Sequence, residues 1–296
     1  MLKNIQDLMN PGLESLEVKQ AEGLSLFEAH KAFIEASIAK EKIDKKKIIE
    51  NKMIVSYLLP SCSDKVRAVP NAVLRGALFG VVGRGRRKHE DNVLKTTING
   101  ISLRYTGKQL DQSDLDVWAE CFRLNQGFRL GEEIFFSSKA FLLGIGRNNG
   151  KTDRDWLYSC FRRLMGAVVE IGDGHCFYTG QLLQHWYRDE KTGKNSLVLN
   201  QKLLPFFQTQ FWTGLILEQR LLLKNKSLAK WLHGFYSTHK NPFEYKVEKL
   251  MDLCGSDVVV VKTFKQKLKK ALIELNSATG WECLIDENHL VHVKKK

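Results

Sequence analysis

One order of secondary-structure elements occurs twice in this sequence, and few folds can contain it: helix, short strand, short helix, long helix and β-hairpin. The second long helix, over 258–276, is the best defined. Its apolar residues fall within one arc at 100° per residue and are Val261, Phe264, Leu268, Ala271, Leu272 and Leu275. This pattern predicts an amphipathic helix that buries one face.

The residues around this helix complete the second occurrence. The predicted elements are a helix over 227–236 closed by Asn241-Pro242, a strand at 245–247, a helix at 248–253, a turn at 255–257 and, after the long helix, a hairpin over 281–293. A helix, a turn, a second helix and a two-stranded wing make up the winged-helix arrangement.

The first occurrence has the same order but is longer. Its predicted elements are a strand at 99–107, an amphipathic helix from 112, a strand at 133–136, a helix at 138–143, a helix after an N-cap at Thr152, and a hairpin of 167–171 with 175–187. Asp111, Asp114 and Asp116 precede or begin the helix at 112. We interpret them as helix-capping and dipole-complementing residues rather than as metal ligands.

These elements define the expected fold class and domains. The fold is predicted to be α+β and mainly helical, with two tandem winged-helix domains at 65–200 and 201–296. Residues 1–64 form an N-terminal helical or flexible arm, because charge there alternates with short apolar clusters.

The charge balance favours a polyanionic partner, since 46 Lys and Arg against 33 Asp and Glu give +13. The long helix of the second domain carries cations opposite its apolar arc. In a helix-turn-helix unit this helix enters the major groove, where Lys can bind guanine and Gln can pair with adenine. The candidate DNA-binding residues are Lys262, Lys265, Gln266, Lys269 and Lys270. The alternative is that these lysines only solubilise the outer face of the helix.

Three further features are candidates for DNA contact. On the matching helix of the first domain these are Ser159, Arg162 and Arg163, which could instead form a surface for a protein partner. The glycine-rich stretch at 83–88 supplies Arg84, Arg86, Arg87 and Lys88, which suit a phosphate backbone or a minor groove unless the loop is simply solvated. His292 on the last strand is a candidate phosphate contact.

Two stretches resemble enzyme motifs, but their residues do not have the spacing that those motifs require. The stretch 144–152 resembles a phosphate-binding loop, but Walker A needs four residues between its glycines and neither Gly146 nor Gly144 provides them before Gly150. His289 and His292 are too far apart for a nickase metal pair. No catalytic residue, metal site or cofactor is predicted. No apolar run reaches the length of a membrane span and no signal peptide is evident, so we expect a cytoplasmic protein without a membrane partner.

Four stretches resemble the TrfA family of plasmid replication initiator proteins. They are 66–71 (VRAVPN), 75–79 (RGALF), 103–110 (LRYTGKQL) and 250–257 (LMDLCGSD), and the similarity runs from about residue 66 to the C-terminus. The resemblance implies a non-enzymatic initiator with two winged-helix domains that binds direct repeats, called iterons, in double-stranded plasmid origin DNA. It also implies help in opening the origin, recruitment of a host helicase and a host initiator, and an inactive homodimer.

The resemblance also implies a motif for a host sliding clamp in the N-terminal arm. Leu24, Ser25, Leu26 and Phe27 match its last four positions, but Gly23 stands where the family has Gln. A capping box of Ser25 with Glu28, at the start of a helix to Lys40, explains the same residues without a partner.

Other functions remain open from the residues themselves. A transcriptional repressor would use the same fold on DNA. A nucleic-acid-processing enzyme and a pure interaction scaffold are further alternatives, although the chain supplies neither metal ligands nor a nucleophile for the former.

Overall fold

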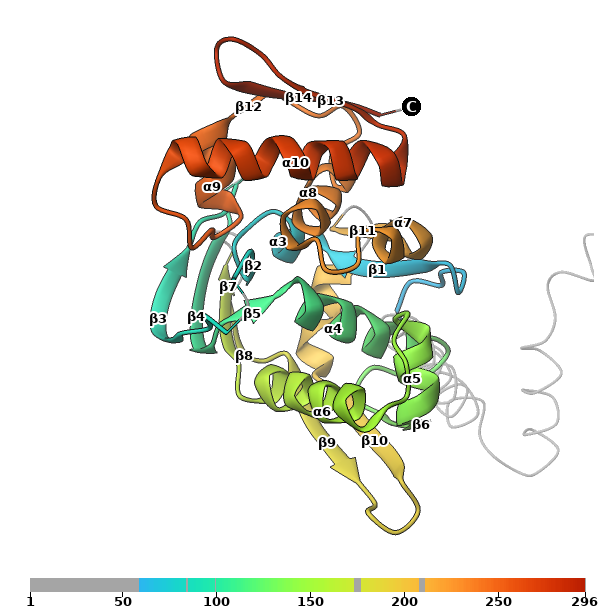
Figure 1. The fold of residues 1–296 in the computed structure, drawn as a ribbon. Helices are drawn as coiled ribbons and strands as arrows, with labels where there is room; N and C mark the ends of the chain where they lie inside the picture. Colours follow the sequence, from blue (N-terminus) through green and yellow to red (C-terminus); the bar gives the residue numbers. More distant parts are fainter. Residues whose placement is uncertain (1–58, 84, 99, 173–176, 208–210, 296) are drawn as a thin grey trace, which may run out of the picture. The chain divides into compact units, whose positions relative to one another are not determined.

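The computed structural model describes residues 59–83, 85–98, 100–172, 177–207 and 211–295 (Figure 1). Within them the buried apolar side chains form two clusters, one extending from Leu59 to Leu215 and the other from Leu223 to Val293. The expected clamp motif at 24–27 and Arg84 lie outside the described residues. The predicted domain boundaries at 64/65 and 200/201 stay predictions.

The second winged helix follows the predicted order of elements. It consists of α8 (Ser227–Ser237), β12 (Tyr245–Lys246), α9 (Val247–Leu253), α10 (Val261–Thr279), β13 (Glu282–Ile285) and β14 (Leu290–Lys294). The sheet has the order β12-β14-β13, with all neighbours antiparallel. The wing is therefore the β13–β14 hairpin, and its inner strand is tied to the short strand that precedes α9.

The apolar arc of α10 is confirmed as a core face, since its residues from Phe264 to Leu275 are buried. The helix begins at Val261 rather than at 258, because 258–260 form an extended entry segment. It ends at Gly280, which adopts a left-handed φ of 73°. A side chain would disfavour this conformation, so glycine is the residue that suits the helix end.

The first winged helix contains the same sheet order. Its elements are α4 (Gln112–Leu124), β6 (Glu133–Ser137), α5 (Ser138–Gly144), α6 (Lys151–Met165), β9 (Leu183–Arg188) and β10 (Lys194–Leu199). The sheet β6-β10-β9 repeats the arrangement β12-β14-β13. Asp111 caps α4 in a capping box with Asp114, as the sequence predicts, whereas the N-cap of α6 is Gly150 and not Thr152.

The wing of the first winged helix is not the hairpin that directly follows α6. β7 (Val168–Gly172) and β8 (Phe177–Gln181) do pair, but β7 also pairs with β4 (Ser102–Lys108), giving the sheet β3-β4-β7-β8. The wing is the β9–β10 hairpin. β10 is the central strand, because it pairs with both β6 and β9, and its side chains are mostly buried. The β7–β8 hairpin, which belongs to this separate sheet, is thus inserted between α6 and the wing.

Strands contribute more to the fold than predicted, and a mainly helical fold is not confirmed. Besides the two winged-helix sheets and the strands β4, β7 and β8, the additional strands are β1 (Val66–Pro70), β2 (Phe79–Gly80), β3 (His89–Lys95), β5 (Leu110–Asp111) and β11 (Trp212–Ile216). Between β1 and β2 lies the short helix α3 (Asn71–Leu74), and Phe79 of β2 pairs with Leu110 in a parallel ladder.

The strand that precedes the first winged helix and the strand that follows it lie side by side. β1 pairs with β11 antiparallel, from Val66 with Ile216 to Pro70 with Trp212. A 3-10 helix, η2 (Gln201–Phe207), precedes β11, and α7 (Leu217–Leu222) follows it without an intervening loop. None of the helices in these described ranges has both the length and the apolarity needed to cross a membrane.

Candidate nucleic-acid interface

The outer face of α10 carries cations without counter-charges. Lys262, Gln266, Lys269 and Lys270 are exposed and Lys265 is half-buried. None of these lysines forms an ion pair with another residue of the described part of the chain. Lys265 and Lys269 are one helical turn apart, and like charges at this spacing destabilise a helix slightly. A bound polyanion would remove that repulsion.

A basic hollow adjoins this face. It lies between the start of α8 and the side of α10 and has a volume of about 240 Å³. Three cations, Lys226, Lys267 and Lys270, line it together with the carboxylates of Asp257 and Glu274. Lys267 is exposed and was not singled out by sequence, because it lies at the flank of the apolar arc. The hollow extends the cationic surface of α10 towards α8.

The described part of the basic stretch, Gly83 and 85–88, lies against the entry to α10. The Val81 amide donates to the Cys254 carbonyl at 2.8 Å, and Arg86 lies 3.4 Å from the Asp257 carboxylate. Arg86 is largely exposed, and such surface pairs contribute little stability. Arg86 and the exposed Lys88 are therefore available to an anion, next to the helix that carries the lysines.

The wing places His292 between two carboxylates. Its Nε2 lies 3.0 Å from Asp286 and its Nδ1 lies 3.1 Å from Glu244. The hydrogen bond to Asp286 raises the pKa of the imidazole, with Glu244 acting in the same direction. The charge that His292 acquires is already neutralised locally, which makes it a weaker phosphate contact than the sequence alone indicates.

The three candidate DNA-binding residues on α6 differ in their exposure and in their partners. Arg162 is exposed and has no ion pair with the described residues. Arg163 instead binds the fully buried carboxylate of Asp114 on α4, with Nη2 2.7 Å from Oδ1. Ser159 donates to the Trp156 carbonyl at 2.7 Å and accepts from Arg163. Arg162 is thus the candidate that faces outward, while Arg163 and Ser159 are engaged inside the first winged helix.

Arg87 is engaged by the same carboxylate. Its Nη1 lies 2.7 Å from Oδ2 of Asp114, and its Nη2 contacts Asp111. Asp114 therefore holds one arginine on each oxygen, and it also accepts from the Asp111 amide as part of the capping box. Burial acts to lower the pKa of Arg163, but the Asp114 charge outweighs this and raises it. Arg87 and Arg163 are thus held by carboxylates of the first winged helix, which leaves them less available to DNA than Arg162.

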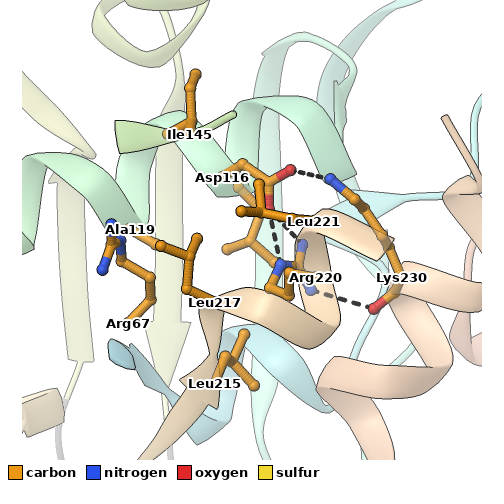
Figure 2. Close-up of a pocket in the computed structure, with 10 residues that line it drawn as sticks. Arg67, Asp116, Ala119, Ile145, Leu215, Leu217, Arg220, Leu221 and Lys230 are labelled. Atoms are coloured by element: carbon orange, nitrogen blue, oxygen red, sulfur yellow. Dashed lines mark hydrogen bonds and ion pairs between the residues drawn. The ribbon is translucent and has the colours of Figure 1, made fainter. Parts of the chain in front are cut away.

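Charged side chains also join the two winged helices. On α4, Asp116 accepts from Arg220 of α7 at 2.7 Å and contacts Lys230 of α8 (Figure 2). Arg220 further donates to Gln112 and to the Lys230 carbonyl. The cavity among these residues is only about 20 Å³, room for about one water molecule. This region is a packed junction and not a ligand site.

The wing of the first winged helix adds two cations that sequence reasoning missed. Lys191 and Lys194 are exposed at its tip, where Asp189 accepts from the Lys191 amide and Gly193 has a positive φ of 68°. A turn-forming stretch between two alternating segments is a recognised hairpin signal, so DEKTG at 189–193 could have identified this wing.

The arrangement of elements has solved counterparts. Domains 2 and 3 of RctB match with a TM-score of 0.55 and 13% identity, over 77% of this chain and 99% of that one. At this identity the likeness shows the fold alone, which is that of a protein with paired winged-helix units. The Pi initiator protein, solved in complex with iteron DNA, is similar with a TM-score of 0.47 and 12% identity, over 61% of this chain and 91% of its own.

Sequence comparison adds the family. The family described as TrfA protein matches residues 23–295, and the chain belongs to this family. The plasmid replication initiator protein TrfA of Escherichia coli is 23% identical over 240 residues, which cover 78% of this chain and 62% of that protein. The chain therefore spans less than two thirds of that relative's length. The resemblance found from the four sequence stretches is confirmed.

Proposed function

We propose that this chain is a plasmid replication initiator that binds direct repeats in double-stranded origin DNA and has no enzymatic activity of its own. The observation that carries the proposal is the unpaired cationic face of α10, beside the basic loop at 83–88. Membership of the TrfA family supports it, as does the name of the E. coli relative. Lys262, Lys265, Gln266, Lys269 and Lys270 would bind the major groove, and Arg86 and Lys88 the adjoining phosphates.

The packing order of the helices supports binding of one repeat by one chain. α6 packs on α4, α4 contacts α8, and α8 packs on α10 (Figure 1). Neighbouring helices lie about 8–10 Å apart, so three such steps place α6 at most about 24–30 Å from α10. This approaches the roughly 34 Å turn of B-DNA that separates successive major-groove faces. Arg162 on α6 would contribute the contact at the second groove.

Origin opening and host partners complete the proposal. The family resemblance supports recruitment of a host sliding clamp through Leu24–Phe27, of a host helicase and of a host initiator. It also supports a homodimer as the inactive form. These proposals concern segments or partners that are not described in the structure.

Footprinting on DNA neighbouring the coding gene tests the proposal. We expect protection of direct repeats spaced by about two helical turns. A plasmid that carries those repeats should then replicate only when the protein is supplied. Protection of a single operator without support for replication would instead identify a transcriptional repressor.

A charge-removal pair tests which surface binds. Lys269→Ala with Lys270→Ala should weaken binding and reduce the slope of log affinity against log salt by about 0.9 for each lost phosphate contact. Lys65→Ala with Lys202→Ala removes the same charge from exposed positions before β1 and on η2, and should leave the slope unchanged. Equal slopes for both double variants would exclude α10 from the interface.

A further inference from the structure

The entry segment of α10 exposes two valines. Val259 is 88% exposed, more than any other large apolar side chain in the described ranges, and Val260 is 59% exposed. Val258, directly before them, packs against the second core cluster. The chain therefore anchors this segment by one valine and turns the next two away from the protein.

Local structure does not account for these valines. Val260 is the N-cap of α10 and makes no side-chain cap, although Ser, Thr, Asp or Asn at this position would satisfy a free amide of the first turn. Exposed apolar surface also forgoes the free energy that burial would supply. A segment that is unfavourable on both counts in the free protein is suited to a contact that forms only on binding.

The surroundings identify what the valines meet. They lie at the N-terminal end of the second helix of a helix-turn-helix unit, the part that contacts base edges in the major groove. Lys262 is two residues beyond Val260, and Arg86 lies beside Asp257 on the other side. These two cations disfavour an apolar protein partner and attract DNA. The apolar feature on the major-groove edge of DNA is the thymine C5 methyl group.

We infer that Val259 and Val260 contact thymine methyl groups, and that each repeat carries thymine where it faces the start of α10. This inference rests on the proposed function, because it assigns part of the sequence preference of the same helix. The cations of α10 then supply attraction to the duplex and contacts to guanine or adenine. The two valines discriminate thymine from cytosine.

Uracil substitution tests the contact directly, because uracil lacks only the methyl group of thymine. The full chain is titrated with a synthetic duplex of the footprinted repeat in which each thymine is replaced by uracil in turn. At one or two positions we expect affinity to fall about fourfold, the value of one buried methylene-sized group. For Val259→Ala and Val260→Ala the uracil penalty at those positions should disappear, as a double-mutant cycle requires for a direct contact.

The control variant is Val168→Ala, which removes the same atoms from an exposed valine of β7. It should bind with unchanged affinity and keep the full uracil penalty. If no uracil substitution weakens the wild-type protein, or if the penalty persists in both valine variants, the inference is overturned while repeat binding stands. If no repeat is protected at all, the proposed function itself fails.

Discussion

Arg220 on α7 donates from Nε to the Asp116 carboxylate on α4 at 2.7 Å, which joins the two winged helices through a nearly buried arginine (Figure 2). Lys230 on α8 binds the other oxygen of the same carboxylate. One acidic side chain therefore pairs with two cations at the junction. Removing it leaves both charges uncompensated in a largely dry environment.

Asp116→Asn keeps the shape of this side chain and removes its charge. Loss of one partner of a buried pair costs about 3–5 kcal/mol, and the partial exposure of Asp116 should reduce this to about 2–3 kcal/mol. Urea denaturation at pH 7 measures the difference. Asp155→Asn, at an exposed carboxylate on α6, should change the free energy of unfolding by less than about 0.5 kcal/mol. Equal stability of the two variants would contradict a structural role for Asp116.

The pH dependence of this variant has a definite sign. Burial acts to raise the pKa of Asp116, but Arg220 and Lys230 outweigh it and hold the pKa below its usual value. A lowered native pKa contributes stability that is present above the unfolded pKa and is lost as the pH falls through the native pKa. The gap between wild type and Asp116→Asn should therefore persist from pH 7 to pH 5 and close below about pH 4.

Arg162 and Arg163 form a matched pair of neighbours with opposite roles. Arg162→Ala should leave stability within about 0.5 kcal/mol and reduce the salt slope of DNA binding by about 0.9. Arg163→Ala leaves the buried Asp114 with Arg87 as its remaining arginine, so we expect a loss of about 2–4 kcal/mol in the free energy of unfolding. Thermal unfolding and DNA titration on both variants separate the two roles. A stable Arg163→Ala with weakened DNA binding would reverse the assignment.

His233 also makes the protein less stable as the pH falls, but its effect begins at a higher pH than that of Asp116. Burial, together with the charge of Arg220, lowers the pKa of its imidazole to about 3. The native protein keeps His233 neutral, while the unfolded chain takes up a proton below about pH 6.5. The unfolded state is therefore increasingly favoured as the pH falls from about 6.5 to 3. Between pH 7 and pH 5 this residue alone should cost about 2 kcal/mol of stability.

The measurement is the free energy of unfolding by urea at pH 7 and at pH 5. His233→Gln cannot take up the proton, so its loss over this interval should be about 2 kcal/mol smaller than that of wild type. His239, whose pKa burial also lowers, retains a slope of the same sign in this variant. His185→Gln, at an exposed position on β9, should keep the wild-type slope. An unchanged slope in His233→Gln would show that His233 is not held neutral.

Local periodicity predicts the second winged helix well. The apolar arc of α10 follows from residues within one helix, so Phe264 and Leu268 could be assigned to the core without knowledge of their partners. The outward position of Lys269 follows from the same periodicity. Capping of α4 by Asp111 is equally local, because donor and acceptor lie within three residues.

The features that sequence patterns did not predict depend on contacts between residues far apart in the chain. Arg163 and Arg162 are adjacent, and only the position of Asp114, 49 residues away, determines that one is engaged and the other is exposed. The first wing was misplaced for a similar reason. β7 and β8 form the nearer hairpin, but β6 pairs with β10, which lies much further along the chain. The β6–β10 pairing depends on tertiary packing, whereas the turn residues at 189–193 mark the β9–β10 hairpin locally.

The β1–β11 ladder limits how the two halves of this molecule can move. Because β11 continues into α7 without a loop, no flexible linker at this point would let one half move freely relative to the other. A change in the separation of α6 and α10 would have to break the contacts of Asp116 with Arg220 and Lys230. Under the proposed function, the spacing of the two major grooves that one chain contacts within a repeat is then set by the arrangement of α6 and α10.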